Sequence, residues 1–317
     1  MKRAPENRRS KPAKLGRKSR KGARRGDTDQ MYTDLFGNTR CRVNLHTHTT
    51  LSDGRKTPAE VAQLYHDAGY DALALTDHWT YGAAGEFDGM TILSGGEYNV
   101  KVCNTREGLF HIVGVGMTHD PEIPFQSTAQ EIIHALRQAG GLVILAHPAW
   151  SLNTPAQILP LKYVDATEIY NTVSGVHMSR RPDSGLIVDM LGAQGRFYPL
   201  IADDDAHYYD NDCCRSWIMV EAADNSREAL MHAIRVGKFY ATQGPEVHLW
   251  REGNEMVVRC SPCAEIGFWS DWVFSHRVFT GDGLTEARYR IDPNEHYVRA
   301  EVTDREGRRA WTNCVVL

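Results

Sequence analysis

The stretch that decides the fold is Arg42-Val43-Asn44-Leu45-His46-Thr47-His48, in which a short apolar run ends in two histidines. The run predicts a β-strand near residues 42–46. Side chains two positions apart on a strand point to the same face, so the imidazoles of His46 and His48 point at one location. The strand therefore ends in two side chains that can bind the same metal ion.

Short apolar runs followed by helical stretches repeat along the chain after residue 40. Further strands are predicted near 72–76, 91–94, 110–116, 142–146, 165–170 and 198–202. The segments Thr57-Pro58-Ala59-Glu60 and Thr128-Ala129-Gln130-Glu131 are capping boxes that predict helix starts. Other helices are predicted at about 179–193 and, capped by Ser226, at about 226–236. This alternation predicts an α/β fold with parallel strands, and the succession of βα units suggests a barrel.

The C-terminal part of the chain, from about residue 246, lacks long helical patterns. Its alternating segments predict strands at 247–250, 256–259, 297–302 and 314–317. We therefore expect one large domain over residues 40–245 and a small antiparallel β module over residues 246–317. The module carries no evident ligand cluster, so it is interpreted as a packing or substrate-lid appendage.

The charge is unevenly distributed. The net charge is −4, but residues 1–30 contain twelve Lys or Arg and only three acids, which leaves an acidic body. Segment 1–39 is predicted to be disordered, because it has too little apolar surface to fold. A tail without a partner, or an extension before a true start at Met31, is the favoured interpretation. The alternative is contact with nucleic acid or an anionic membrane, and a nucleic-acid partner is expected only through this segment.

Composition also bounds the class of protein. The 317 residues can bury a full core, and no apolar run is long enough for a membrane helix or a signal peptide. A cytoplasmic protein without a membrane partner is expected. The seven cysteines are interpreted as reduced thiols, and Cys260-x-x-Cys263 lacks the second pair that a zinc ribbon needs.

Acidic residues and histidines follow the other predicted strands as well. A single such histidine is usually an ordinary surface or core side chain, but six of the fourteen lie at strand ends beside Asp or Glu. Ligands that gather at one rim of a βα repeat predict a site with several metals. The segments concerned are Ser52-Asp53-Gly54, Thr76-Asp77-His78, Gly95-Gly96-Glu97, His111, Ala146-His147-Pro148 and Asp205-Ala206-His207.

These motifs, in this order, resemble those of the polymerase-and-histidinol-phosphatase (PHP) family of metal-dependent phosphoesterases. The resemblance covers roughly residues 40–245. The segment Gly237–Pro245, Glu168-Ile169-Tyr170-Asn171 and the end of the β module are similar to the carbaryl-hydrolase-like branch of that family. The resemblance implies a distorted (βα)7 barrel.

The resemblance also implies a ligand set for two or three divalent ions. Zn, Mn and Fe all suit such nitrogen and oxygen ligands. Glu97 would bridge the first two ions, and His111 is favoured over the nearby His119 by its position at a strand start. The implied groups are His46, His48, Glu97 and Asp205 for one metal, Glu97, His111 and His147 for the second, and Asp53, His78 and His207 for the third.

The expected reaction is hydrolysis of a phosphate ester in a small phosphorylated metabolite or nucleotide. A hydroxide bridging the first two metals would attack phosphorus, with Asp205 and His207 as catalytic residues and His207 stabilising the leaving oxygen. Asp77 and Asp204 would orient ligating imidazoles. Cations that follow barrel strands would bind the substrate phosphate, namely Lys101, Arg106, Arg180 and Arg181.

Two alternatives stay open at this point. The same metals could serve a carbamate, ester or amide hydrolase, or the domain could be a non-catalytic metal-binding PHP module. Neither the substrate nor the oligomeric state is indicated by the sequence.

Overall fold

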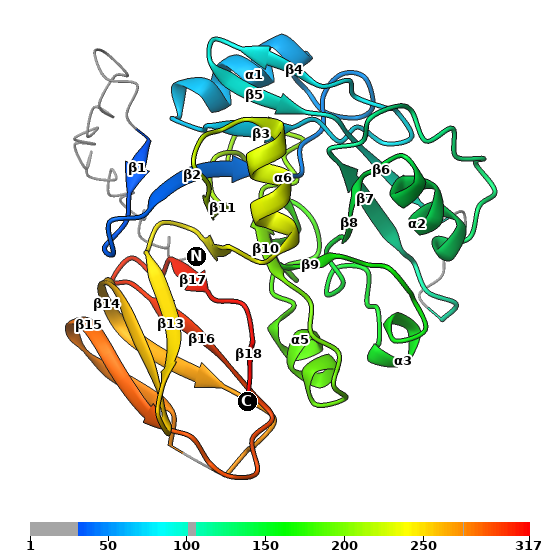
Figure 1. Ribbon diagram of the computed structural model, residues 1–317. Coiled ribbons are helices and arrows are strands. Elements are labelled where there is room, and N and C mark those ends of the chain that lie inside the picture. Colours follow the sequence, from blue (N-terminus) through cyan, green and yellow to red (C-terminus); the bar gives the residue numbers. More distant parts are fainter. Residues whose placement is uncertain (1–30, 101–105, 275) are drawn as a thin grey trace, which may run out of the picture.

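The computed structural model describes residues 31–100, 106–274 and 276–317, and shows a mixed α/β protein with two sheets (Figure 1). The first sheet runs through both parts of the chain. In the N-terminal part it contains β1 (Tyr32–Thr33), β2 (Thr39–Asn44), β3 (Ala72–Ala74), β4 (Gly85–Phe87), β5 (Met90–Leu93), β11 (Trp217–Glu221) and β12 (Phe239–Thr242). The second sheet contains β6 (Gly95–Asn99), β7 (His111–Val115), β8 (Leu142–Leu145), β9 (Ala166–Asn171) and β10 (Leu200–Asp203).

The predicted succession of parallel strands is only partly present. Strands β2, β3 and β5 are parallel, as are β8, β9 and β10, but β7 is antiparallel to both β6 and β8. The sequence pattern did not predict β6. This strand contains glycines and pairs with β7 in an antiparallel arrangement, so no crossover helix marks it as a separate strand. Strands β11 and β12 were also not predicted.

The two sheets do not form one closed ladder among the described residues, so the (βα)7 barrel is not confirmed. Single bridges between Thr47 and Ala206 and between His78 and Glu97 join the sheets instead. A core of apolar side chains nevertheless fills the space between the sheets, including Val43, Leu45, Ile144, Ile201 and Val220.

Six helices accompany the sheets in the described residues. They are α1 (Pro58–Asp67), α2 (Ala129–Gln138), α3 (Pro155–Ile158), α4 (Thr172–Val176), α5 (Gly185–Gly192) and α6 (Arg227–Arg235). One of them, α4, contributes to the pocket described below. Both predicted capping boxes and the Ser226 cap are confirmed. The helix predicted over 179–193 begins only at Gly185, because Pro182 lacks an amide and disfavours helical backbone before it.

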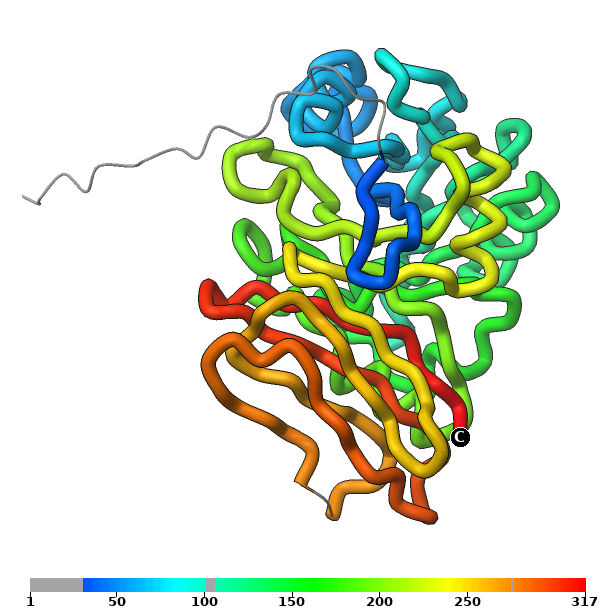
Figure 2. Tube along the Cα trace, turned by 60° about the vertical axis from the view of Figure 1, so that its left-hand side comes forward, coloured from blue at the N-terminus to red at the C-terminus, as the bar shows by residue number. Residues whose placement is uncertain are grey.

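The C-terminal β module lies beside this domain and shares its first sheet through the pairing of β12 with β17 (Figure 2). Its strands are β13 (Val247–Glu252), β14 (Glu255–Trp269), β15 (Val278–Arg290), β16 (Tyr297–Thr303), β17 (Arg309–Trp311) and β18 (Val315–Val316). Strands β15 and β17 were not predicted. Among the contacts that dock the module, Arg299 binds both carboxylate oxygens of Asp189, and Trp311 stacks on Tyr170 of β9 at 5.3 Å.

The predicted disordered segment 1–39 needs a correction at its end. Residues 1–30 lie outside the described residues, but 31–39 are ordered and contain β1. Polar contacts hold them: Asp34 accepts from Arg40 at 2.7 Å, and the Tyr32 hydroxyl donates to Glu246 of the β module at 2.6 Å. In the described chain no helix has the length and hydropathy to span a bilayer.

Candidate metal centre

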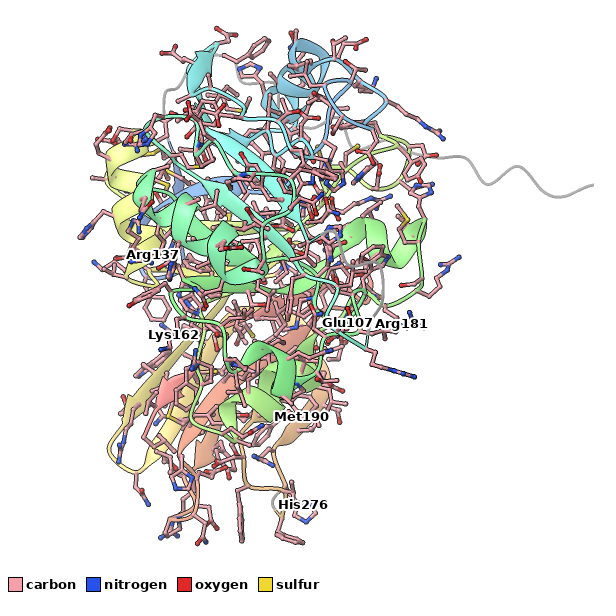
Figure 3. All side chains as sticks on the ribbon, turned by 90° about the vertical axis from the view of Figure 1, so that its right-hand side faces the viewer. Glu107, Arg137, Lys162, Arg181, Met190 and His276 are labelled. Atoms are coloured by element: carbon pink, nitrogen blue, oxygen red, sulfur yellow. The ribbon has the colours of Figure 1, made fainter. Side chains whose placement is uncertain are left out.

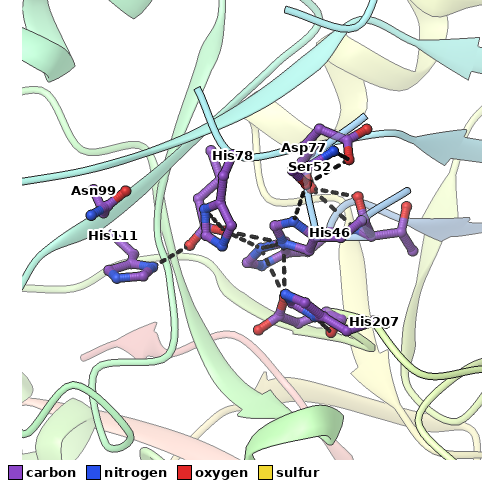
Figure 4. Close-up of polar contacts among 12 residues, drawn as sticks. His46, Ser52, Asp77, His78, Asn99, His111 and His207 are labelled. Carbon is purple, nitrogen blue, oxygen red and sulfur yellow. Dashed lines mark hydrogen bonds and ion pairs between the residues drawn. The ribbon is translucent and has the colours of Figure 1, made fainter. Parts of the chain in front are cut away.

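The nine predicted metal ligands converge at one end of the two sheets, although they are spread over 160 residues of sequence. His46 and His48 follow β2, His78 follows β3, and Asp205 and His207 follow β10. Glu97 lies on β6, His111 begins β7, and His147 follows β8. Figure 4 shows His46, His78, His111 and His207 around a common centre. The alternative His119 is exposed and hydrogen-bonds to its neighbour Thr118.

Glu97 is the centre of this arrangement, and its carboxylate is buried. Its Oε2 lies 3.2 Å from His46 Nε2, 3.1 Å from His48 Nε2 and 3.2 Å from His78 Nδ1. Its Oε1 faces the other side, 2.6 Å from His111 Nδ1 and 3.4 Å from His147 Nε2. One carboxylate thus presents separate oxygens to two groups of imidazoles, as a bridge between two cations requires.

The group on the Oε2 side is the most compact. Asp205 Oδ1 lies 3.2 Å from His46 Nε2 and 3.0 Å from His48 Nε2, and the two imidazole nitrogens are 3.2 Å apart. Their ligand atoms lie close enough to hold one cation together with Glu97. This is the group that the resemblance implied for the first metal.

The group implied for a third metal is wider and more exposed. Asp53 Oδ1 lies 3.5 Å from His207 Nε2, and Asp53 Oδ2 lies 3.8 Å from His78 Nε2. His48 Nδ1 also faces Asp53 Oδ1, at 3.6 Å. Since the Asp53 side chain is 56% exposed, a cation here would be held less firmly than beside Glu97.

Close backbone approaches explain the glycines of two motifs. A Cβ on Gly54 would lie 2.3 Å from the carbonyl oxygen of His48, so the turn that carries Asp53 has no room for a side chain there. A Cβ on Gly95 would lie 2.5 Å from the carbonyl oxygen of Leu75. The glycines therefore let the turn and β6 approach the strands that carry histidines.

Two candidate ligands have left-handed backbone. The φ angles are 27° at His147 and 50° at Asp205, a region that non-glycine residues rarely occupy. Hydrogen bonds hold each residue there, since the His147 amide donates to Glu168 and the Asp205 amide donates to His46. Such strain is typical of functional sites.

The charges of the cluster are strongly coupled. Burial lowers the pKa of His46, but Asp205, Glu97 and Glu168 outweigh burial and raise it well above its usual range. Burial opposes protonation of His48 too, yet Asp205 and Glu97 raise its pKa to about 9. Burial would raise the pKa of Glu97 and Asp205, but the facing imidazoles hold both values well below normal. The carboxylates thus stay ionised and need positive charge beside them.

The donor set fits divalent metal ions. Asp205 Oδ1 and His78 Nδ1 are buried and have no hydrogen-bond partner among the described residues, although both lie beside Glu97 or its imidazoles. Unpartnered buried polar atoms are costly, and a cation would satisfy both. Imidazole and carboxylate ligands suit Zn, Mn or Fe and do not distinguish among them.

A pocket opens above the cluster and gives a substrate access to it. No Lys or Arg is among the described residues that line it, and Trp150, Val173 and Met178 provide apolar surface. The complete lining is Asp53, His78, Glu97, His111, His147, Trp150, Val173, Ser174, Met178, Asp205 and His207. Tyr170 does not line this pocket, because it packs on Trp311.

The predicted phosphate-binding cations are not brought to this pocket. Arg106, Arg180 and Arg181 are exposed and absent from its lining, and Figure 3 shows Arg181 near the edge of the molecule. Lys101 lies outside the described residues. Arg55 is likewise exposed and absent from the lining, but it is attached to the ligand segment: its amide donates to the His207 carbonyl at 2.8 Å, and its guanidinium lies 4.5 Å from the Tyr208 ring centre. Its position directly after Ser52-Asp53-Gly54 could have pointed to it.

The carboxylates expected to orient imidazoles have other contacts. Asp77 accepts hydrogen bonds from Thr49 and Ser52 and so holds the turn after His48. Asp204 accepts from the Tyr65 hydroxyl and from three amides of residues 214–216. Both therefore support loops rather than imidazole rings. The carboxylate that contacts His46 Nδ1, at 2.6 Å, is Glu168.

Comparison with known proteins gives a fold but no close relative. No family model and no curated protein matches the sequence. A two-domain protein from Bacteroides vulgatus, described as containing a predicted PHP-like metal-dependent phosphoesterase, is similar in structure with a TM-score of 0.53 and 13% identity over 93% of this chain and 99% of that one. An amidohydrolase from Chromobacterium violaceum, crystallised with sulfate and no metal, has a TM-score of 0.40 and 17% identity over 54% of this chain and 89% of that one. The first likeness shows a similar overall fold alone, and the second is too weak to support an argument.

Proposed function

We propose that this protein is a metal-dependent hydrolase of the PHP family that cleaves phosphate esters. The observation that carries the proposal is the buried Glu97 carboxylate, whose two oxygens face separate groups of imidazoles at the base of an open pocket. Divalent ions bound there would activate water and stabilise negative charge on a phosphoryl group. His46, His48, Glu97 and Asp205 would hold one ion, and Glu97, His111 and His147 a second.

His207 and Asp53 occupy the open side of the cluster, where the leaving group would lie. His207 Nδ1 lies 2.7 Å from the main-chain oxygen of Asp205 and donates to it, which directs Nε2 toward Asp53 and the pocket. That nitrogen can bind a third cation or, when protonated, donate a proton to the leaving oxygen. Asp205 acts as a ligand in this scheme, since Oδ1 faces His46 and His48 and Oδ2 accepts from Asn171.

Arg55 supplies the positive charge that an anionic substrate needs in the proposed site. Its guanidinium stacks on Tyr208, which follows His207 in the chain. A planar guanidinium matches the oxygens of a phosphate, and stacking keeps its hydrogen-bond donors free for that contact. We assign it the role that the sequence suggested for Lys101, Arg106, Arg180 and Arg181.

Family details remain part of the proposal. The main-chain contacts that join β2 to β10 and β3 to β6 support an interpretation of the two sheets as halves of a distorted (βα)7 barrel. A relationship to the carbaryl-hydrolase-like branch rests only on the sequence segments quoted for it, such as Gly237–Pro245.

A second candidate function is hydrolysis of an uncharged ester, amide or carbamate at the same metals. The described pocket lining favours it in one respect, because Trp150, Val173 and Met178 are apolar and no Lys or Arg accompanies them. Carbonyl hydrolysis also uses a metal-activated water, so the cluster itself suits both reactions.

The two functions are separated by matched chromogenic substrates. Protein treated with chelator and reloaded with Zn²⁺ or Mn²⁺ is assayed with p-nitrophenyl phosphate, bis-p-nitrophenyl phosphate and p-nitrophenyl acetate. The proposal expects metal-dependent release of p-nitrophenol from a phosphate ester and little from the acetate. Metal-dependent turnover of the acetate alone would establish the carbonyl reaction. Tight metal binding with no turnover of any ester would favour a non-catalytic module.

A further inference from the structure

We propose that Glu168 is a positioning residue for the metal centre, and that with Asn171 it holds ligands of both bridged metal positions in place. This inference rests on the proposed function only in that the cluster binds divalent cations. It concerns a carboxylate that is not among the predicted ligands and does not line the pocket.

The contacts of Glu168 reach two of the proposed ligands directly. Glu168 lies on β9 and is fully buried. Its Oε1 lies 2.6 Å from Nδ1 of His46. Its Oε2 accepts hydrogen bonds from the main-chain amide of His147 at 2.9 Å and from Asn171 Nδ2 at 2.8 Å. The same Asn171 group also donates to Asp205 Oδ2, at 3.1 Å.

Each contact constrains a ligand in a different way. A proton on Nδ1 of His46, donated to Glu168, leaves the other ring nitrogen, Nε2, with its lone pair toward Glu97 and Asp205. The bond to the His147 amide holds that residue in its left-handed backbone, at φ 27°. Asn171 fixes the orientation of the Asp205 carboxylate through Oδ2, so that Oδ1 faces the imidazoles.

A glutamine cannot replace Glu168 in this arrangement. Three donors converge on the two carboxylate oxygens, whereas a glutamine has a single acceptor oxygen and an NH2 group that only donates. With its NH2 group toward His46, the imidazole must carry its proton on Nε2 and loses its lone pair for a metal. With its NH2 group toward the other side, the glutamine places a donor against two other donors, the His147 amide and the Asn171 side-chain amide. Glu168→Gln therefore preserves the size of the side chain but removes one of its two acceptor oxygens.

The test measures metal affinity rather than turnover. Wild type and Glu168→Gln are titrated with Zn²⁺ in competition with a chromophoric chelator, and their Co²⁺ forms are compared by visible absorption. We expect Zn²⁺ affinity to fall about 10- to 100-fold, with altered Co²⁺ bands. If wild type binds Zn²⁺ and Glu168→Gln has the same affinity and the same Co²⁺ spectrum, this inference alone is overturned. A wild type that binds no Zn²⁺ would overturn it together with the proposed function.

Glu295→Gln is the matched control for general destabilisation. Glu295 is a buried carboxylate of the β module and accepts from four donors, namely the Ser270 hydroxyl at 2.6 Å, the Tyr289 hydroxyl at 2.8 Å, the Asp292 amide at 2.9 Å and the Arg277 guanidinium at 3.3 Å. We expect it to lower the melting temperature while Zn²⁺ affinity stays within about twofold. A loss of affinity as large as that of Glu168→Gln would overturn the inference.

A second variant decides the matter if Glu168→Gln does not fold. Asn171 Oδ1 caps α4 by accepting from the Ser174 amide, and serine is also a good capping residue. Asn171→Ser therefore keeps a cap but cannot reach Glu168 or Asp205. We expect weaker Zn²⁺ binding, by less than in Glu168→Gln, and an unchanged affinity would overturn the inference.

Discussion

The main-chain amide of Asp205 donates a hydrogen bond of 2.9 Å to the carbonyl oxygen of His46. These residues follow strands β10 and β2, which belong to different sheets. Thr47 and Ala206 form a bridge beside this bond, so main-chain pairing alone fixes the relative positions of the ligands that follow both strands. Much of the centre is therefore built before any cation binds.

Glu97→Gln should abolish the bridge between the two imidazole groups. A glutamine presents only one acceptor oxygen and no charge, so one of the two metal positions loses its shared ligand. We expect bound metal to fall below two ions per chain and kcat/KM to fall more than about 100-fold. Metal analysis and the phosphate ester assay measure these effects. Glu228→Gln, at a 78% exposed side chain, is the control and should match wild type.

The stability of the metal-free protein should fall between pH 7 and pH 9. Folding raises the pKa of His48 from 6.5 to about 9, so the folded state binds a proton that the unfolded state lacks in this interval. That stabilisation is complete below pH 6.5 and is lost as the pH rises through about 9. Melting temperatures in chelator should therefore decrease from pH 7 to pH 9, less so in His48→Ala. A melting temperature that rises over this interval would contradict the assignment.

Metal binding should show the opposite pH dependence. A metal ligand must be a neutral imidazole, and His48 is protonated at pH 7 in the metal-free protein. The apparent Zn²⁺ affinity should rise about tenfold per pH unit for each histidine that loses a proton. Competition titrations between pH 6.5 and pH 8 measure this slope, and a flat profile would show that the histidines are already neutral.

Gly54→Ala should destabilise the turn that carries Asp53. The new Cβ would lie 2.3 Å from the His48 carbonyl oxygen, and only backbone movement can relieve that clash. We expect a loss of about 2 kcal/mol or more in the free energy of unfolding, measured by denaturant titration. In Gly85→Ala the added Cβ meets open space, so this exposed position should change by less than about 1 kcal/mol.

Arg55→Ala should weaken binding of an anionic substrate without affecting an uncharged one. Loss of a charged hydrogen bond costs about 1.5–3 kcal/mol, so KM for p-nitrophenyl phosphate should rise about tenfold or more. Turnover of p-nitrophenyl acetate, where present, should stay unchanged. Arg181→Ala provides the comparison, at another exposed arginine that, like Arg55, does not line the pocket. A larger effect of Arg181→Ala would restore the assignment made from sequence.

Trp311→Ala should loosen the β module from the first domain. Trp311 is fully buried and stacks on Tyr170 of β9, four residues after the strand begins to pair with β8. Truncation of such a side chain costs about 3–5 kcal/mol. Denaturant unfolding and limited proteolysis would show this loss. Trp269→Ala, at a 41% exposed residue of the same module, should cost much less.

Features that depend on residues close together in the chain were predictable from the sequence. The Thr57 and Thr128 capping boxes form as expected, because a cap involves residues only three positions apart. His46 and His48 converge because strand geometry alone places their side chains on one face. The order of the motifs also indicated which carboxylates and histidines meet, through resemblance to a family.

Features that depend on distant segments required the tertiary structure. The contact of Glu168 with His46 joins residues 122 positions apart, and no local pattern indicates it. Likewise, only the tertiary structure shows that Arg55 packs on Tyr208 beside His207, since a long flexible side chain can take many directions from the main chain. The sequence by itself determined the strand ends and the ligand types. The meeting of two sheets decided how those ligands are held, because hydrogen bonds and ion pairs act over a few ångströms that only the folded chain brings together.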